Sequence, residues 1–448
     1  MEFILMHKDV EVAKINLDEN NAVKTIVMIY RQNHLPFSAD NIFSFREWWN
    51  DRSIPLTRDD YQNIRNNLPH DNSFSLVVKS HALSLTDQYW IKREGEEIRY
   101  DDISFFSNAF SNDIGDILLG EQLKGKPSYY SPDSTSIGNL KKRWKIIEGK
   151  RYLLKSGTKP YHFEVMNEII ASKIMNVLGI DHVEYELYHE GKNIFCRSLD
   201  FISYNEDFIS AYQLKNSKKK RNDISLYDHL LSVLEDIKIP NYKTKINQML
   251  FVDYLIGNVD RHLNNFGVIR DAKTLEFTRF APIFDSGSSL GFDVADDELN
   301  KLVHVEWMPF KSQKNQDQLS LIDDYSWLNL DALQSVPQLI DQFLKSYECY
   351  LPSNRRQAVL NFLIKRINYI YRYLKVDKEV SLRSVDLTCL EEDILQRVYN
   401  NNKLIDLEFL ANEYDVAYIT IYRAVSSLVK KGLLKRTGSR KNGYWILP

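Results

Sequence analysis

The sequence has few cysteines and no long hydrophobic run. Its three cysteines, Cys196, Cys349 and Cys389, are far apart and odd in number, which excludes a disulfide scaffold and a cysteine-rich zinc site. No stretch approaches the roughly 18–20 apolar residues that span a bilayer. The first fourteen residues mix acids with lysines and lack the apolar core of a signal peptide. We therefore expect a cytoplasmic protein that makes no membrane contact.

An excess of either charge is also missing, because 58 Lys and Arg residues face 61 Asp and Glu residues. A protein that coats nucleic acid would be strongly basic, so any nucleic-acid role must be confined to one region. No internal repeat occurs at the periods of solenoid proteins. The chain has 448 residues and is 44% hydrophobic, which predicts two or three globular domains.

The first part of the chain divides into two segments. Residues 1–125 alternate short apolar runs with polar turns, which is typical of an α+β region, but no spacing in them indicates a chemistry. In the segment 126–222, two strand-like runs at 144–148 and 151–155 flank Gly149-Lys150 and predict a hairpin. A helix over 164–178 follows this hairpin.

Helical periodicity dominates residues 223–375, and one predicted hairpin interrupts it. Residues 266–270 read as a strand, 271–274 as a turn and 276–284 as the returning strand, after a helix that stops at Gly257. An antiparallel return brings the start of the first strand beside the end of the second. Polar side chains that flank this hairpin are therefore expected to lie close together.

Three such side chains are Asp260, Asn265 and Asp285. One carboxylate can orient or deprotonate an attacking hydroxyl, while a second carboxylate and an amide oxygen hold Mg²⁺ through oxygen. Each residue alone also fits a structural role, as a turn cap, a strand start or a loop start. Their joint placement favours phosphoryl transfer from a Mg-nucleotide.

Candidates for nucleotide binding lie upstream. Gly138, in SIGNLKKRW, would let backbone N–H groups approach phosphate oxygens, although a plain surface turn is the other interpretation. Lys155 ends the second strand of the first hairpin, and Glu168 lies near the start of the following helix. Kinases use a strand lysine held by a helix glutamate to direct an ammonium toward the nucleotide phosphates. Two exposed, unpaired side chains are the alternative.

The order of these parts resembles the HipA-like serine/threonine kinases of bacteria over roughly residues 126–375. The matching stretches are SIGNLKKRW, RYLLK, EVMNE, GNVDRHLNNF and PIFDSGSS. The resemblance implies an α+β, two-lobed protein-kinase-like fold, with ATP between a small lobe at 126–222 and a helical large lobe at 223–375. A toxin or stress-response role is implied by the family alone.

The resemblance also implies roles for individual residues. Asp260 resembles the catalytic aspartate, Asn265 a metal-binding asparagine, and Asp285 the aspartate of the DFG-equivalent. Lys155 resembles the nucleotide-binding lysine, with Glu168 as its partner. His262 matches the motif's histidine and is interpreted as loop-orienting. The remaining implied residues are Gly138 and Asn139 in the ATP-binding loop, and Ser134, Thr135 and Ser136 as a hydroxyl cluster for autophosphorylation.

The C-terminal segment, 386–448, follows a polar linker and has the pattern of three helices and a hairpin, which is the winged-helix arrangement. Residues 416–448 contain seven basic and no acidic residues, whereas residues 381–415 have a net charge of −5 from three basic and eight acidic residues. This separation favours contact with DNA phosphates, although protein contact or dimerisation is the alternative. The DNA-contact candidates are Thr420, Tyr422, Arg423, Lys430, Arg440 and Lys441.

We therefore expect an ATP- and Mg²⁺-dependent serine/threonine protein kinase joined to a DNA-binding winged helix. Its partners would be a protein that offers a hydroxyl acceptor and duplex DNA. One alternative is a transcriptional regulator whose kinase-like domain only senses a nucleotide. Another is a lipid or metabolite kinase, because D-R-H-x-x-N also occurs in phosphatidylinositol kinases. The phosphorylated substrate, the operator, homodimer formation and the role of residues 1–125 stay open.

Overall fold

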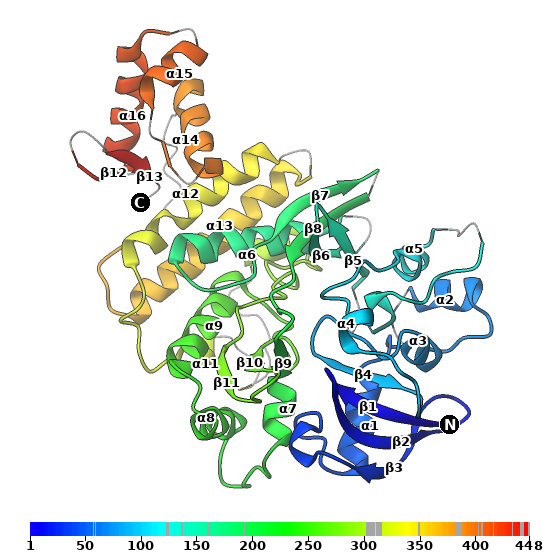
Figure 1. Ribbon diagram of the computed structural model, residues 1–448. Coiled ribbons are helices and arrows are strands. Elements are labelled where there is room, and N and C mark those ends of the chain that lie inside the picture. Colours follow the sequence, from blue (N-terminus) through cyan, green and yellow to red (C-terminus); the bar gives the residue numbers. More distant parts are fainter. Residues whose placement is uncertain are drawn as a thin grey trace.

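The computed structural model shows a mixed α/β molecule with several small sheets and a helical body (Figure 1). Among the described residues, no helix is long and apolar enough to cross a membrane. The description covers residues 1–448 except 57, 59, 122–124, 136–137, 139, 159–160, 192, 302–309, 311–315, 348–349, 381–387, 402, 405, 415, 432, 440–442 and 447–448.

The N-terminal region is built on a four-stranded antiparallel sheet in the order β3-β2-β1-β4. The aromatic side chains of α1 pack on this sheet, with Phe45 and Trp49 fully buried. The strands are β1 (Glu2–His7), β2 (Val10–Leu17), β3 (Val23–Ile29) and β4 (Tyr89–Lys92). The helices are η1 (Gln32–His34), α1 (Ile42–Asn50), α2 (Tyr61–Asn67), α3 (Ser73–Lys79), α4 (Tyr100–Ile103), α5 (Asp113–Leu119) and η2 (Pro132–Thr135).

The small lobe has a four-stranded antiparallel sheet in the order β5-β6-β8-β7, with helix α6 packed against it. The predicted hairpin is present, but its turn is Glu148-Gly149 rather than Gly149-Lys150, because Ile147 pairs with Lys150. Both turn residues have positive φ values, 50° and 75°, as a two-residue hairpin turn requires. The elements are β5 (Lys142–Ile147), β6 (Lys150–Lys155), α6 (Phe163–Leu178), β7 (Glu186–Glu190) and β8 (Asn193–Leu199).

A second sheet, in the order β11-β10-β9, carries the hairpin predicted around 271–274. β9 lies within the segment predicted as the small lobe, yet it pairs with β10. Residues 200–205 therefore link the two sheets. The strands are β9 (Glu206–Ser210), β10 (Gly267–Asp271) and β11 (Phe277–Phe280). The helices are α7 (Ala211–Asn216), α8 (Leu226–Asp236), α9 (Tyr242–Ile256), α10 (Asp296–Lys301), α11 (Gln316–Leu319), α12 (Leu330–Ser346) and α13 (Ser353–Tyr373).

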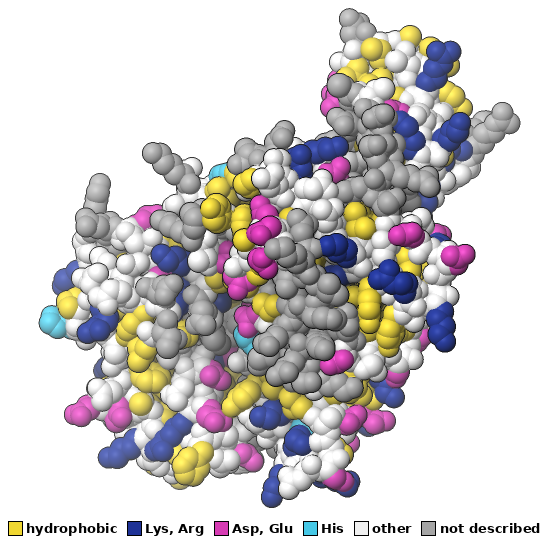
Figure 2. Space-filling view, turned by 180° about the vertical axis from the view of Figure 1, so that it is seen from behind, with side chains coloured by type: hydrophobic (Ala, Val, Ile, Leu, Met, Phe, Trp, Pro, Cys, Tyr) yellow, Lys and Arg dark blue, Asp and Glu magenta, His cyan; other side chains and the backbone are white. Residues whose placement is uncertain are grey.

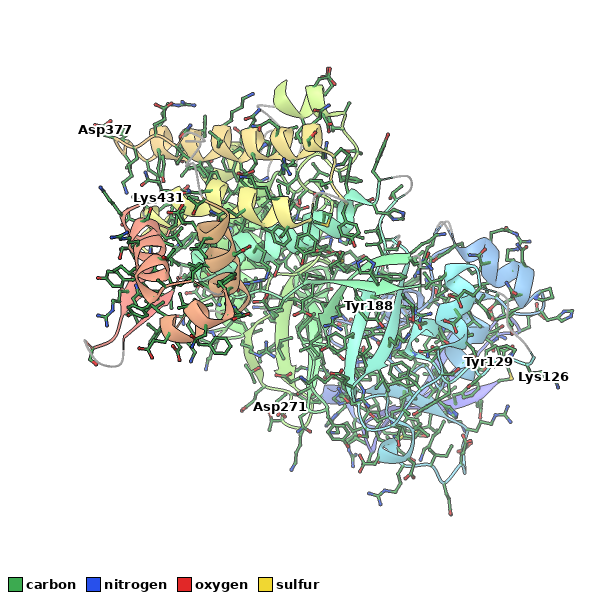
Figure 3. All side chains as sticks on the ribbon, turned by 90° about the horizontal axis from the view of Figure 1, so that it is seen from above. Lys126, Tyr129, Tyr188, Asp271, Asp377 and Lys431 are labelled. Carbon is green, nitrogen blue, oxygen red and sulfur yellow. The ribbon has the colours of Figure 1, made fainter. Side chains whose placement is uncertain are left out.

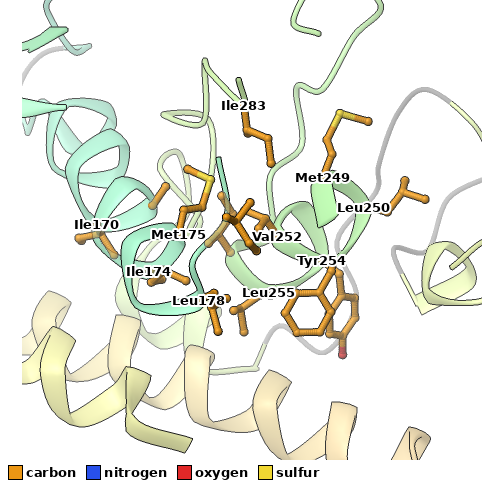
Figure 4. Close-up of a cluster of buried hydrophobic side chains, with 14 of the residues drawn as sticks. Ile170, Ile174, Met175, Leu178, Met249, Leu250, Val252, Tyr254, Leu255 and Ile283 are labelled. Atoms are coloured by element: carbon orange, nitrogen blue, oxygen red, sulfur yellow. The ribbon is translucent and has the colours of Figure 1, made fainter. Parts of the chain in front are cut away.

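One hydrophobic core joins α6 to α9, α12 and α13. In Figure 4, Ile174 and Leu178 of α6 lie close to Leu255 of α9. Burying each such side chain stabilises the fold by about 1.5–3 kcal/mol. This packing fixes α6, which holds Glu168, against α9, which leads into the loop of Asp260.

The C-terminal module has the element order of a winged helix, and its assignment to that class stays a prediction. Its hairpin is tied to the segment between the first two helices by the hydrogen bonds between the backbones of Leu404 and Trp445. The module lies at the end of the molecule away from the N-terminal region (Figure 1). Its elements are α14 (Cys389–Asn401), α15 (Leu407–Glu413), α16 (Tyr418–Lys430), β12 (Lys435–Thr437) and β13 (Tyr444–Ile446).

Candidate active site

Strand β6 and helix α6 position a buried lysine–glutamate ion pair. Nζ of Lys155, the last residue of β6, lies 2.7 Å from Oε1 of Glu168 in the second turn of α6, and the two side chains are 6% and 2% exposed. Burial alone would lower the pKa of Lys155, but the carboxylates of Asp285 and Glu168 raise it well above its usual value. The ammonium group therefore stays charged in the folded protein.

Asp285 shares the same lysine. Nζ of Lys155 donates to Oδ1 of Asp285 at 2.5 Å. The backbone of Asp285 is left-handed, with φ 58°, which is uncommon outside glycine and typical of constrained functional turns. Glu168 holds this turn, because its Oε2 accepts a hydrogen bond from N of Ser286 at 2.9 Å. Burial alone would raise the pKa of Asp285, but Lys155 and Lys142 bring it well below its usual range.

The loop after α9 carries Asp260, His262 and Asn265. Gly257 ends the helix with φ 62°, and a Cβ there would lie 2.6 Å from Cζ of Phe362, so a larger residue does not fit. The carbonyl oxygen of Asp260 accepts from N of His262 and from Nδ2 of Asn265, both at 2.8 Å. This use of Nδ2 leaves Oδ1 of Asn265 as the atom that can coordinate a cation.

The carboxylate of Asp260 lies at the exposed edge of this loop. Its pKa is raised, chiefly by partial burial and further by the nearby charge of Asp285, while His262 opposes the shift. A carboxylate with a raised pKa is a better proton acceptor near neutral pH. Nδ1 of His262 accepts a hydrogen bond from N of Asn264 at 3.2 Å within this loop, and its loop-orienting role stays a prediction.

Arg261 joins the two loops and was not singled out from the sequence. Its buried guanidinium lies 2.9 Å from Oδ2 of Asp253. It also donates to O of Asn265 at 2.9 Å, to Oγ of Ser286 at 3.1 Å and to O of Phe284. The structure thus brings the Asp260–Asn265 loop and the turn of Asp285 together, as the hairpin pattern predicts.

Lys142 is a second basic group that sequence reasoning missed. It pairs with Lys155 across β5 and β6, and directly opposed residues in antiparallel strands share a face. Gly138 has φ 97°, and a Cβ there would lie 2.6 Å from Nζ of Lys142. Burial, together with the nearby charge of Lys155, lowers the pKa of Lys142 to about 8, although Asp285 opposes the shift. The strand register was the signal that could have identified this residue.

The predicted hydroxyl cluster is only partly described. Ser134 and Thr135 are buried in η2, where their hydroxyls donate to O of Tyr129 at 3.4 Å and to O of Leu83 at 2.8 Å. Ser136 and Asn139 lie outside the described residues. Phosphorylation of Ser134 or Thr135 therefore requires this turn to open.

The oxygen donors at the site fit a magnesium ion that is bound together with a nucleotide better than a metal ion held by protein side chains alone. In the described part of the chain, no group of three or more His, Cys, Asp or Glu side chains could hold a metal ion. Asp285 and Oδ1 of Asn265 supply hard oxygen ligands, and Mg²⁺ is usually held by one or two carboxylates together with substrate phosphates. Lys155 and Lys142 are the cations available to such phosphates.

In the C-terminal module, Thr420, Tyr422 and Arg423 lie on the exposed face of α16, and Lys430 is exposed at its end. Tyr418 stacks on Tyr422, with ring centroids 6.4 Å apart. Figure 2 shows several Lys and Arg side chains on this module, at the top of the view. Arg440 and Lys441 lie outside the described residues.

Lys431 corrects the expectation of seven uncompensated basic residues. Its Nζ lies 2.8 Å from Oε1 and 2.9 Å from Oε2 of Glu391, so this pair holds α14 to the end of α16. Figure 3 shows Lys431 within the C-terminal module, on the opposite side of the molecule from Tyr129.

The fold thus places a strand lysine and a helix glutamate beside the turn of Asp285, an arrangement that a protein-kinase-like site requires. Residues 135–348 match the family HipA-like C-terminal domain. The match covers just under half of the chain, so the segment is similar to this family.

Known proteins are similar to parts of this chain. The chain is 28% identical over 218 residues to the serine/threonine-protein kinase CtkA of Helicobacter pylori, which covers 42% of this chain and 66% of the relative, just under two thirds. Two solved structures are also similar. The crystal structure of CtkA gives a TM-score of 0.41 at 20% identity, covering 52% of this chain and 95% of that chain. HipA of Shewanella oneidensis, solved with HipB and operator DNA, gives a TM-score of 0.46 at 14% identity, covering 84% and 98%.

Proposed function

We propose that the protein is an ATP- and Mg²⁺-dependent serine/threonine protein kinase. The observation that carries this proposal is the position of Lys155, which binds Glu168 at 2.7 Å and Asp285 at 2.5 Å beside the loop of Asp260. Bound Mg-ATP supplies the transferable phosphoryl group. A sensor that only binds nucleotide does not need Asp260, because that residue serves the acceptor.

Each residue of this chain has a part in the proposed reaction. Lys155 neutralises phosphate oxygens while Glu168 fixes its ammonium, and Lys142 adds a second positive charge from the opposing strand. Asp285 and Asn265 hold the cation through oxygen. Asp260, at the exposed edge of the site, accepts the proton of the incoming hydroxyl or orients it.

Label transfer from [γ-³²P]ATP distinguishes this proposal from its alternatives. A protein kinase places the label on serine or threonine of a protein, in the presence of Mg²⁺. Label on an extracted lipid or small molecule would favour the lipid or metabolite kinase. Binding of ATP with no transfer to any acceptor would favour the nucleotide sensor.

The C-terminal module is proposed to bind duplex DNA through α16 and the hairpin. The exposed face of α16, with Thr420, Tyr422 and Arg423 near its N-terminal half, supports this second function. Retention of the full chain on heparin and on random duplex DNA, both strongly weakened by salt, tests the proposal. Absence of both would favour a protein-contact role.

A toxin or stress-regulating role is a further part of the proposal. HipA of Shewanella oneidensis belongs to a toxin–antitoxin system by its description. Expression of the wild-type chain in bacteria should arrest growth, and expression of Asp260→Ala should not. Equal growth of both strains at equal protein levels would contradict this role.

A further inference from the structure

The N-terminal region is anchored to the small lobe at strand β5. Asp116 of α5 forms an ion pair with Arg143, the residue after Lys142. Nη2 of Arg58 donates to O of Lys142 at 3.3 Å. From the neighbouring strand, Arg151 donates to O of Asn108 at 3.1 Å. These contacts hold the strand whose first residue faces the proposed phosphate site.

The same region is anchored to the other lobe at β9 and β10. Nε2 of Gln88 donates to O of Glu206 of β9 at 2.8 Å. Asp207, the next residue of this strand, is fully buried and accepts from Nε2 of His7 at 3.0 Å. It also pairs with Arg270 of β10, whose Nη2 donates to the hydroxyl of Tyr89 at 2.8 Å. Residues separated by 200 positions thus form one buried polar cluster.

The two anchors lie on opposite sides of the chain segment that joins the lobes. That connection is the six-residue stretch 200–205, which leads from β8 in one sheet to β9 in the other. Asn265 precedes β10 and Asp285 follows β11, so both belong to the sheet held at Asp207. Figure 1 shows the N-terminal region beside both sheets, with α5 near β5 and with β1 and β4 near β9.

We propose that residues 1–125 act as a brace that fixes the distance between the two lobes, with Asp116 and the pair His7 and Gln88 as positioning residues. The inference rests on the proposed nucleotide-binding function. The braced geometry is the binding-competent one, because Lys155 of the small lobe contacts Asp285 of the large lobe in it. Release of either anchor populates looser arrangements and weakens nucleotide binding.

A brace makes a quantitative prediction that two independent effects do not. Releasing either end alone frees the lobes, so releasing the second end after the first should change binding little. If each anchor variant released its end and weakened binding about tenfold, their combination would also weaken it only about tenfold. If the two anchors acted independently, their fold-losses in affinity would multiply, to about 100-fold.

The test uses the full-length chain and calorimetric binding of Mg²⁺ with a non-hydrolysable ATP analogue. The variants are Asp116→Ala at the small-lobe anchor, His7→Phe with Gln88→Met at the other anchor, and all three together. The first control is Glu190→Ala, which removes the other carboxylate on Arg143, at 2.7 Å, within the small lobe. Asp116→Asn is a milder second variant, and thermal unfolding shows that each protein is folded.

The brace predicts weaker analogue binding for each anchor variant, a loss in the combination close to that of the more damaging single variant, and binding close to wild type for Glu190→Ala. Turnover at saturating ATP should change less than KM. Unchanged affinity in folded variants, fold-losses that multiply, or an equal loss in Glu190→Ala would overturn the brace. Failure of the wild-type protein to bind the analogue would instead overturn the proposed function.

Discussion

The two carboxylates on Lys155 should affect stability and turnover to different degrees when each is replaced by its amide. Glu168 is 2% exposed and bonds both Lys155 and N of Ser286. Removing one partner of a buried ion pair costs about 3–5 kcal/mol. Because Asp285 still neutralises Lys155 at 2.5 Å, we expect Glu168→Gln to cost about 2–3 kcal/mol.

Asp285→Asn should destabilise the protein less and affect turnover more. The side chain of Asp285 is 31% exposed, and Glu168 continues to neutralise Lys155, so the cost should be about 1 kcal/mol or less. An amide cannot supply the charge that holds the cation, so turnover should fall by about a thousandfold or more.

Thermal unfolding and label transfer measure the two effects on the same samples. A cost of 2–3 kcal/mol lowers the unfolding midpoint of a domain of this size by about 4–12 °C. Glu186→Gln is the control, because Glu186 pairs with Arg197 at 2.9 Å but is 60% exposed, and it should lower stability by less than about 1 kcal/mol. A larger stability loss in Asp285→Asn than in Glu168→Gln, or normal turnover in Asp285→Asn, would refute the reasoning.

Three further predictions follow from the structure. The pKa of Lys142 is lowered to about 8, chiefly by burial, so its positive charge is lost as the pH rises through that value. Mg-ATP affinity measured by calorimetry should therefore fall over the same pH range. The variant Lys142→Met should abolish this pH dependence. Arg423→Ala and Lys430→Ala should each reduce the slope of log affinity for DNA against log salt by about one, and an unchanged slope in filter binding would contradict phosphate contact. Incubation with ATP should place one phosphate in the segment of Ser134 and Thr135 and lower activity, and mass spectrometry that finds none would exclude this site.

The local elements were largely predictable from the sequence. Helical periodicity predicted α6 and the helical character of residues 223–375, and the hairpin patterns predicted β5–β6 and β10–β11, because each is specified by neighbours in the chain. The pairing of Lys155 with Glu168 and the approach of Asp285 to the loop of Asp260 followed from those elements. Their chemical roles stay predictions.

Contacts between distant segments were not predictable in the same way. The pairing of β9 with β10 and the cluster of His7, Asp207 and Arg270 depend on tertiary packing, which a single sequence does not show. Arg261 lies inside the motif that carried the resemblance, yet its place between the two loops depends on its burial. The proposed bracing role of residues 1–125 depends on the same kind of long-range contacts, so the sequence alone did not indicate it.

The most direct test of the central claim compares Asp260→Ala with the wild-type chain in Mg-ATP binding and in phosphate transfer. The variant is expected to bind Mg-ATP with nearly unchanged affinity in calorimetry, because Asp260 is proposed to serve the acceptor and not the nucleotide. The account also predicts ³²P on protein serine or threonine with the wild type and none with the variant. Transfer by Asp260→Ala at the wild-type rate would contradict the account.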